Sequence, residues 1–258
     1  MVTGAARGIG AATVRALAQD GWSVVATDRC SDDPRLPYAL GTREQLEQVV
    51  AEANLLGGSV LAVQADTCSV SELAAAFGEA ESRFGGVDAA FAVAGVVAGG
   101  VPLWEQPEGE LQAVMDVDLM GVITLARLAI PALLRRPAPR AGRFLAVSSA
   151  AATRGLPMLA AYGAAKAGVH GLVRGLAAEL RGTGVTANCV SPGSTRTAVL
   201  DESARLYELP DAQHFATQQA VQRLLEPEEV AAALVWLAGP GSSGITGADI
   251  PVDGGFAL

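Results

Sequence analysis

Short apolar runs alternate with amphipathic helical patterns along the whole chain, and this alternation most limits how the chain can fold. Five such runs end in Gly, Asp or Ser, at residues 22–28, 60–66, 88–95, 143–149 and 185–193. Between them lie helical patterns such as GAATVRALAQDG and SELAAAFGEAESRFG. Strands that are apolar on both faces suit a parallel sheet covered by helices on each side. Because no repeat or long linker divides the chain, we predict one doubly wound α/β domain over its whole length.

Composition and charge exclude several classes of function. Half of the 258 residues are apolar, and the net charge is −9 without any run of Lys or Arg, so nucleic acid has no electrostatic footprint here. The longest uncharged stretch, residues 89–104, is Gly-rich and shorter than the ~20 residues that span a bilayer. Three separated cysteines, Cys30, Cys68 and Cys189, fit reduced thiols, and no leader pattern precedes Val2. We expect a cytoplasmic protein that binds neither nucleic acid nor membranes.

The segment TGAARGIG, Thr3 to Gly10, lies between a strand end and a helical pattern. Glycines at such a turn let the backbone approach a pyrophosphate, which then sits at a helix N-terminus where free N–H groups favour anions. The spacing G-x-x-x-G-x-G differs from the commoner dinucleotide fingerprint, and a tight strand-to-helix turn alone also uses glycines. Only three residues precede Gly4, so either the first strand is clipped or the native chain begins before this numbering.

A carboxylate at the end of the next strand favours the nucleotide interpretation. Asp28 stands where it can accept hydrogen bonds from both ribose hydroxyls and would repel a 2′-phosphate. NAD is therefore favoured over NADP, although Arg29 follows directly and weakens that preference. The alternative is a solvated Asp at a strand end.

A second constellation lies in YGAAK, where Tyr162 and Lys166 stand four residues apart and so share one helix face. An unperturbed Tyr has a pKa of about 10, too high for a base at neutral pH, but a nearby Lys and a positively charged nicotinamide both lower it. Ser149 ends the run RFLAVSS, where its hydroxyl can orient a substrate oxygen. A Tyr–Lys pair alone is common on helix surfaces without any function. Together with Ser149 and the glycine segment, the pair indicates an acid–base site.

Together these motifs resemble those of the short-chain dehydrogenase/reductase family over nearly the whole chain. The resemblance rests on TGAARGIG (3–10), Asp28, Asp66 in QADTCS, Ala94-Gly95, Ser149, Tyr162-x-x-x-Lys166, SPGSTRT (191–197) and TGADIPVDGG (246–255). It implies a Rossmann-like fold with a seven-stranded parallel sheet and helices on both faces, an NAD(P) cofactor and a homotetramer.

The resemblance also implies a role for each matching position. Tyr162 is the implied acid/base, Lys166 lowers its pKa and holds the nicotinamide ribose, and Ser149 positions the substrate oxygen. Asp66 contacts adenine, and the backbone of Pro192–Thr197 holds the carboxamide and phosphates. The implied cofactor-binding residues are Gly4, Arg7, Gly8, Ile9, Gly10, Asp28, Asp66, Thr67, Ala94, Gly95, Tyr162, Lys166, Pro192, Gly193, Thr195 and Thr197.

The chain departs from the family pattern at two places. The family's Asn-Asn-Ala-Gly motif reads AVAG at residues 92–95, so two amides and their hydrogen bonds are missing. In DVDLMG, Asp118 replaces the Asn that completes the family's catalytic tetrad by supporting a kinked helix and a water between the Lys and solvent. A carboxylate accepts from that water but cannot donate, and it favours a charged Lys166. Asp118 is either a tolerated near-isostere or part of an altered proton relay; we include it among the catalytic residues.

The two histidines give no metal-ligand pattern, so we predict no metal site. His170 follows the Tyr–Lys helix and is expected at the surface or in an interface. His214 lies within residues 197–225, the expected substrate lid. Three further lid residues either line a partly apolar substrate pocket or pack between helices: Tyr207, Leu209 and Phe215.

An insertion at about residues 30–43, CSDDPRLPYALGTR, lengthens the connection that follows Asp28. Surface insertions are cheap to tolerate, so a neutral decoration is one interpretation. A similar insertion marks the mycofactocin-coupled branch of the family, and AAATRGLPMLAAY and RLLEPEEVA add to the likeness. That resemblance implies an NAD that stays bound while an external, peptide-derived redox carrier recycles it. In that case we predict that Leu36, Tyr38 and Leu40 shield the adenosine ribose from water.

Three functional hypotheses follow. The first is an NAD-dependent alcohol dehydrogenase or ketoreductase that interconverts a small secondary alcohol and a ketone, with hydride moving to or from nicotinamide C4 and a proton through Tyr162. The second keeps the fold and cofactor but catalyses a non-redox step, such as dehydration, cyclisation or epimerisation, and Asp118 is its best support. The third, a cofactor-sensing binding protein, fits less well because Ser149, Tyr162 and Lys166 are all present.

Overall fold

A seven-stranded parallel sheet forms the centre of the protein, and the computed structural model describes all residues, 1–258. The strands are β1 (Val2–Thr3), β2 (Ser23–Asp28), β3 (Ser59–Gln64), β4 (Ala89–Ala92), β5 (Arg143–Val147), β6 (Thr186–Pro192) and β7 (Asp249–Val252). Their order in space is β3-β2-β1-β4-β5-β6-β7. The chain winds outward in both directions from β1 and β4, which creates the kind of switch point where open α/β sheets bind ligands. This arrangement confirms the predicted doubly wound, seven-stranded fold.

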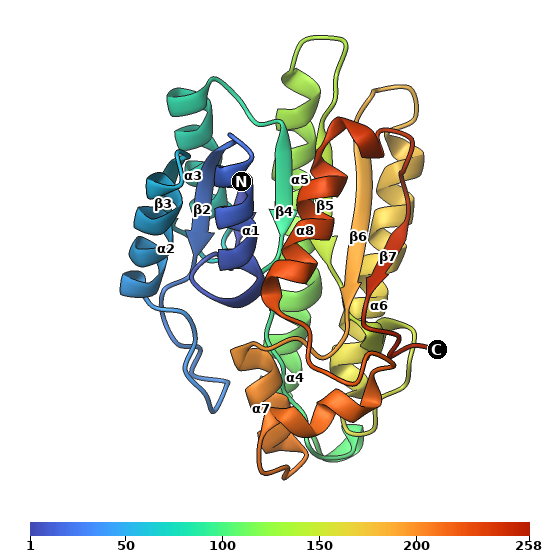
Figure 1. Ribbon diagram of the computed structural model, residues 1–258. Helices are drawn as coiled ribbons and strands as arrows, with labels where there is room; N and C mark the ends of the chain where they lie inside the picture. Colours follow the sequence, from blue (N-terminus) through green and yellow to red (C-terminus); the bar gives the residue numbers. More distant parts are fainter.

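Helices cover both faces of the sheet (Figure 1). The helices are α1 (Gly8–Gln19), α2 (Arg43–Leu55), α3 (Val70–Phe84), α4 (Glu108–Met115), α5 (Gly121–Arg135), α6 (Ala160–Glu179), α7 (Ala198–Leu206) and α8 (Pro227–Ala238). One face carries α1, α2 and α8, and the other carries α3, α5 and α6. Figure 1 shows the strand arrowheads pointing toward the end of the molecule where α7 lies.

Each face of the sheet buries a separate apolar core. Leu17 of α1, Leu46 of α2 and Leu234 of α8 belong to one core, and Leu125 of α5 and Val169 of α6 belong to the other. Each such fully buried side chain contributes roughly 1.5–3 kcal/mol. These two cores hold the sheet rigid, and the carboxyl ends of its strands therefore form a fixed platform for the connecting segments.

The apolar runs of the sequence became strands as predicted, and the patterns quoted for helices became α1 and α3. The first and last strands along the chain are short: β1 has 2 residues and β7 has 4. Their pairing is supplied by longer neighbours, because β1 pairs with β2 and β4, and β7 pairs with β6. Periodicity cannot reveal strands of that length, since two or four residues contain too few alternations.

A continuous helical stretch, Glu108–Arg135, joins α4 to α5 through a π-helical turn at Asp116–Met120. This stretch is long and apolar enough to cross a membrane, with a mean hydropathy of 1.8 in its most apolar window, but 56% of that window is buried inside the protein. Buried core helices of soluble proteins meet the same criteria. A π-helical turn inserts one extra residue per turn and often marks a functional site.

Candidate active site

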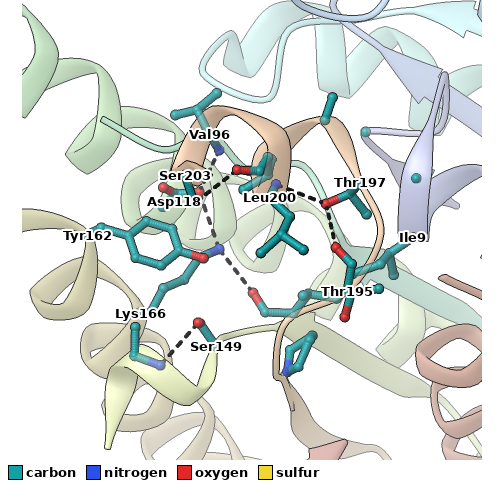
Figure 2. A pocket seen from close by; sticks show the side chains of 18 of the residues that line it. Ile9, Val96, Asp118, Ser149, Tyr162, Lys166, Thr195, Thr197, Leu200 and Ser203 are labelled. Carbon is teal, nitrogen blue, oxygen red and sulfur yellow. Dashed lines mark hydrogen bonds and ion pairs between the residues drawn. The ribbon is translucent and has the colours of Figure 1, made fainter. Parts of the chain in front are cut away.

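A cavity of about 740 Å³ opens at the carboxyl ends of the strands. Every residue that the sequence predicted for catalysis or cofactor binding lies on its wall, although these residues come from segments spread over the chain. They are Gly4, Arg7, Gly8, Ile9, Gly10, Asp28, Asp66, Thr67, Ala94, Gly95, Asp118, Ser149, Tyr162, Lys166, Pro192, Gly193, Thr195 and Thr197. Figure 2 shows part of this wall, with Tyr162, Lys166 and Asp118 on one side and Ile9, Thr195 and Thr197 on the other.

The glycine segment forms a tight turn between β1 and α1. Gly4 has φ +65° and Gly8 has φ +56°, backbone conformations that residues with side chains rarely adopt. A Cβ on Gly10 would lie 2.0 Å from the Gly4 carbonyl oxygen, so the helix packs directly on the turn. Arg7 provides no side-chain cap for α1, and the first residues of the helix, Gly8 to Gly10, line the cavity. Such a helix N-terminus suits a phosphate.

The segment AVAG lacks the amides of the family motif, and the hydroxyl of Thr3 holds its backbone. The hydroxyl of Thr3 accepts hydrogen bonds from the backbone N–H groups of Val93 (3.1 Å) and Ala94 (3.2 Å) and donates to the Phe91 carbonyl oxygen (3.3 Å). One hydroxyl thus joins β1 to the end of β4. The backbone at the switch point remains fixed without the two amides.

Asp28 ends β2 with both carboxylate oxygens already in use as backbone acceptors. Its Oδ2 accepts from the Ala6 N–H and its Oδ1 from the Cys30 N–H, each at 3.1 Å. Gly41 lies so close that a Cβ there would sit 3.0 Å from Oδ1. Each carboxylate oxygen has further acceptor capacity, and Asp28 faces the cavity. Asp28 is therefore held in a fixed position from three sides and still able to accept from a ribose.

Arg29, the residue that weakened the preference for NAD, is bound to carboxylates. Its Nη1 donates to Asp33 Oδ2 at 2.9 Å, and its Nε lies 3.5 Å from Asp66 Oδ2. Asp66 in turn accepts from the Cys68 N–H at 2.8 Å. The guanidinium is thus paired within the protein. A 2′-phosphate would have to compete with two carboxylates for Arg29 and would meet the charge of Asp28.

The insertion projects beyond the carboxyl end of β2 (Figure 1), and its contacts reach α4 and the segment after β4 as well as the Asp28 region. Arg35 Nη1 donates to Asp116 Oδ2 at 2.7 Å, and the Tyr38 hydroxyl accepts from the Val97 N–H at 2.9 Å. Leu36 is buried in a cluster with Val96, Val117 and their neighbours. The insertion therefore connects the Asp28 region to the helix that carries Asp118.

This packing corrects one expectation about the insertion. Of the three apolar side chains predicted to shield the ribose, only Leu40 lines the cavity. Leu36 and Tyr38 pack beside α4 instead. The physical reason is the apolar surface that α4 and the segment after β4 expose at this place, which the insertion covers. The sequence carried no signal of that tertiary contact.

Ser149, Tyr162 and Lys166 meet at the inner end of the cavity. Ser149 caps the short 3₁₀ helix Ala150–Ala152, and its Oγ accepts from the Ala151 N–H at 3.1 Å. Tyr162 and Lys166 project from α6, with the Lys166 Nζ 5.7 Å from the centroid of the Tyr162 ring. Lys166 Nζ donates to the Val147 carbonyl oxygen at 3.3 Å. The ammonium is thus held between β5 and α6, beside the phenol.

Asp118 sits in the π-helical turn and pairs with Lys166. Its Oδ1 is 3.2 Å from Lys166 Nζ and accepts from the Val96 N–H at 3.1 Å (Figure 2). The residue is fully buried, and its second oxygen, Oδ2, has no hydrogen-bond partner. The π-helical turn aims this carboxylate at the lysine. The buried carboxylate–ammonium pair that the sequence allowed is therefore present.

The three buried groups shift one another's pKa. Burial raises the pKa of the Tyr162 phenol, the Lys166 ammonium lowers it, and the Asp118 carboxylate raises it again. Burial alone would lower the pKa of Lys166, but the charges of Asp118 and Tyr162 raise it above its ordinary value. Burial also raises the pKa of Asp118. Asp118 thus keeps Lys166 charged and opposes ionisation of Tyr162.

The segment predicted as a lid forms α7 and a 3₁₀ helix, Ala212–Gln218, beside the cavity. Tyr207 and Phe215 pack edge to face with ring centroids 6.1 Å apart, and both line the cavity together with Leu209. The two interpretations of these residues therefore hold at once. His214 is exposed and does not line the cavity.

The sequence analysis misplaced one residue. His170 was expected at the surface or in an interface, but it is buried within the subunit, with 6% of its area exposed. It lies four residues after Lys166 on the sheet-facing side of α6, where its Nε2 is 3.1 Å from the Ser191 hydroxyl of β6. A histidine on an apolar helix face gives no sequence signal of such a partner, because Ser191 belongs to a distant strand.

The fold and this cavity are those of the doubly wound dinucleotide-binding enzymes. The family model described as enoyl-(acyl carrier protein) reductase matches residues 4–257. The chain is similar to (−)-trans-carveol dehydrogenase of Rhodococcus erythropolis, with 32% identity covering 100% of this chain and 96% of that protein. It is also similar to 3β-hydroxysteroid dehydrogenase 1 of Eggerthella lenta, with 35% identity covering 100% of this chain and 93% of that protein.

A solved structure, carveol dehydrogenase from Mycobacterium avium in complex with NAD, superposes with a TM-score of 0.93 and 28% identity. The match covers 99% of this chain and 95% of that one. The chain belongs to the short-chain dehydrogenase/reductase family.

Proposed function

We propose that the protein is an NAD-dependent oxidoreductase that interconverts a secondary alcohol and a ketone. The observation that carries this proposal is the meeting of Ser149, Tyr162 and Lys166 in the same cavity as the glycine turn and Asp28. Relatives named as dehydrogenases, one solved with NAD, support it. The cavity wall has two parts: one around the glycine turn and Asp28, which we assign to the nucleotide, and one beside Tyr162, which we assign to the substrate.

The residues of the nucleotide part fit NAD. The uncapped N-terminus of α1 and the side-chain-free turn at Gly4 and Gly8 suit the pyrophosphate. Asp28 accepts from the adenosine ribose, and Arg29 beside it is paired with Asp33 rather than free for a 2′-phosphate. When bound, NAD accepts or donates the hydride. We assign Asp66 and Thr67 to the adenine, and Ala94, Gly95 and Pro192–Thr197 to the remaining groups.

Tyr162 moves the proton. As a phenolate it takes the proton from the substrate hydroxyl during oxidation, and as a neutral phenol it gives a proton to the carbonyl oxygen during reduction. The Ser149 hydroxyl orients that same substrate oxygen. Lys166, held charged by Asp118 at 3.2 Å, stabilises the phenolate and holds the nicotinamide ribose. Asp118 is a positioning residue that also favours the charged form of Lys166 and opposes ionisation of Tyr162.

The substrate part of the cavity is mainly apolar. Leu159, Val199, Leu200 and Phe215 contribute to its wall, beside the catalytic Tyr162. Such a wall favours a compact, apolar alcohol or ketone without a charged group near the reacting carbon. The alicyclic alcohols in the names of the carveol and steroid relatives belong to that class. We propose that residues 197–225 close over this substrate as a lid.

The insertion supports the finer proposal that NAD is retained and recycled by a mycofactocin-type redox carrier. Its two ends meet at Asp28, through the Cys30 N–H and the close approach of Gly41. Leu40 adds an apolar side chain to the cavity wall at that place. The contacts of Arg35 and Tyr38 hold the insertion against the body of the protein. Opening this end for NAD exchange would break several of these contacts.

The test begins with protein purified and desalted without added nucleotide. We expect NAD in the extracted supernatant and repeated oxidation of an alicyclic alcohol only when a dye acceptor is added. The variant Leu40→Ala should release NAD faster, whereas Leu55→Ala, at a side chain 88% exposed on α2, should not. Empty protein that turns over freely with added NAD would exclude the carrier proposal and leave the dehydrogenase proposal intact. Absence of redox turnover with a broad alcohol and ketone panel would contradict the latter.

A non-redox step is the second candidate, and the Asp118–Lys166 pair is the observation that favours it. By opposing ionisation of Tyr162, Asp118 favours a neutral phenol, which can donate a proton in a dehydration or epimerisation. Product formation with no net change in the NAD/NADH ratio would identify this class. Location in the cytoplasm and assembly as a homotetramer of single-domain subunits remain predictions.

A further inference from the structure

Three potential metal ligands meet on the α6 side of the sheet, away from the catalytic cavity. His170 comes from α6, Cys189 from β6 and Asp249 from β7. Cys189 and Asp249 are direct neighbours in the β6–β7 register, so their side chains lie on one face of the sheet. His170 reaches the same place from the helix above. None of these residues lines the cavity described above.

The ligand atoms are close enough to share one ion. Asp249 Oδ1 lies 3.5 Å from His170 Nε2 and 3.6 Å from Cys189 Sγ, and all three atoms lie within 4.8 Å of one another. Ligand bonds of 2.0–2.3 Å at tetrahedral angles place neighbouring ligand atoms roughly 3.3–3.7 Å apart. Two of the three separations already have that size. Rotation of the Cys189 or His170 side chain adjusts the third.

The donor set selects a class of metal. One imidazole nitrogen, one thiolate and one carboxylate oxygen suit Zn²⁺ or Co²⁺ and not the oxygen-preferring Mg²⁺ or Ca²⁺. A thiolate and a carboxylate together neutralise a divalent ion, which matters because His170 and Cys189 are both buried. Burial lowers the pKa of His170, which favours the imidazole form that binds metals, whereas burial and then Asp249 raise the pKa of the Cys189 thiol, which must lose its proton to bind.

The hydroxyl of Ser191 lies beside the three potential ligands. The Ser191 hydroxyl lies 3.1 Å from His170 Nε2 and 2.5 Å from Asp249 Oδ1, between two of the ligands. It can act as a fourth ligand or give way to a water. Arg174 is the one cation that acts on His170 and Cys189, and it lowers the pKa of both groups, although its charge also repels a metal ion. Asp249 keeps 18% of its side chain exposed, which gives an ion a path from solvent.

We propose that His170, Cys189 and Asp249 form a structural binding site for a zinc-class divalent cation. A bound ion would join α6, β6 and β7, three elements that already meet through packing, strand pairing and the hydrogen bonds of Ser191 with His170 and Asp249. His170 follows Lys166 by one helical turn, and β6 continues into Pro192 on the cavity wall. The ion would therefore fix the base of the catalytic helix. Binding exchanges the thiol proton for the metal, so affinity rises with pH.

The test is a Co²⁺ titration of the full-length protein after treatment with a chelator. We expect one equivalent to bind, with a thiolate-to-cobalt absorption band in the near ultraviolet that excess Zn²⁺ removes. Cys189→Ala should abolish the band, and Cys68→Ser, at an exposed thiol, should keep it. His170→Asn and Asp249→Asn should each weaken Co²⁺ binding at least ~10-fold. Zn²⁺ at a hundredfold excess over its Kd should raise the wild-type Tm by about 5 °C or more.

Asp249→Asn keeps the proposal testable if Cys189→Ala fails to fold, because Asp249 is partly exposed on an edge strand. Circular dichroism of each variant establishes that it is folded before the titration. Wild-type protein without the absorption band and without a Zn²⁺-dependent rise in Tm would overturn the site. A band that survives in Cys189→Ala and disappears in Cys68→Ser would overturn it equally.

Discussion

Two buried carboxylates, Asp33 in the insertion and Asp118 in the π-helical turn, show opposite uses of the same group. Asp33 is 2% exposed and accepts four hydrogen bonds from Arg29 and Arg35, two on each oxygen. Asp118 is 0% exposed, and its Oδ1 alone has partners, whereas its Oδ2 has none. A carboxylate satisfied on both oxygens stabilises structure, and one left half satisfied remains available to influence chemistry.

The pKa directions follow the same division. Hydrogen bonds from Arg35 lower the pKa of Asp33 well below its ordinary value of 3.8, and burial works against them. Burial raises the pKa of Asp118, with Lys166 working against it. Asp33 is therefore a fixed anion that ties the insertion to Asp116 through Arg35. Asp118 is a carboxylate beside Lys166 whose charged form burial disfavours. The variants below separate these two functions.

The largest effect is expected at the proton-transfer residue that Asp118 influences. Tyr162→Phe should lower turnover at least ~100-fold, because the general acid/base is lost, with NAD affinity nearly unchanged. Steady-state kinetics and a nucleotide-binding titration measure both quantities. Tyr207→Phe is the matched control: it lies on the same cavity wall, but its hydroxyl donates to the Pro157 carbonyl oxygen. Turnover of Tyr162→Phe within tenfold of wild type would remove Tyr162 from its assigned role.

The next effect concerns Asp28, where the insertion begins and ends. Asp28→Ala should shift the ratio of NAD to NADP affinity toward NADP by about tenfold or more, because it removes a ribose acceptor and a repelling charge. The comparison with Asp28→Asn, which keeps the shape and one oxygen, isolates the charge. Isothermal titration with both nucleotides is the measurement. Wild-type protein that already binds NADP as tightly as NAD would contradict the assignment.

A smaller effect is expected at Asp33. Asp33→Asn should lower the Tm by roughly 3–6 °C, because two guanidinium groups lose their shared anion. The folded-state pKa of Asp33 lies below its unfolded value, so its contribution is complete above about pH 4 and declines as the pH falls below that value. The Tm difference between variant and wild type should shrink accordingly in acid. Asp20→Asn, at the exposed end of α1, is the control.

The sequence allowed the sheet, the glycine turn and the residues that meet in the cavity to be predicted, because each leaves a local pattern. Tyr162 and Lys166 share a helix face, and Ser149 ends an apolar run. Two features left no such pattern. The packing of Leu36 and Tyr38 beside α4 and the burial of His170 both depend on surfaces supplied by distant segments.

The nature of Asp118 lies between these cases. Its position in the motif identified it as a neighbour of Lys166, and the distance of 3.2 Å confirms that proximity. Its unpartnered Oδ2 and the π-helical turn that aims it depend on the way α4 continues into α5. Sequence spacing alone does not specify such a turn, because the extra residue is absorbed within one helix.

The most direct test of the account is the pH dependence of alcohol oxidation by wild type, Asp118→Asn and Asp33→Asn, measured in parallel. The Asp118 carboxylate raises the pKa of Tyr162, so its removal lowers that pKa. The rise of activity with pH should therefore move to lower pH by about one unit in Asp118→Asn. Asp33→Asn should keep the wild-type profile, because its charge is already neutralised by Arg29 and Arg35. Superimposable profiles for Asp118→Asn and wild type would show that Asp118 is a passive replacement and would contradict the account.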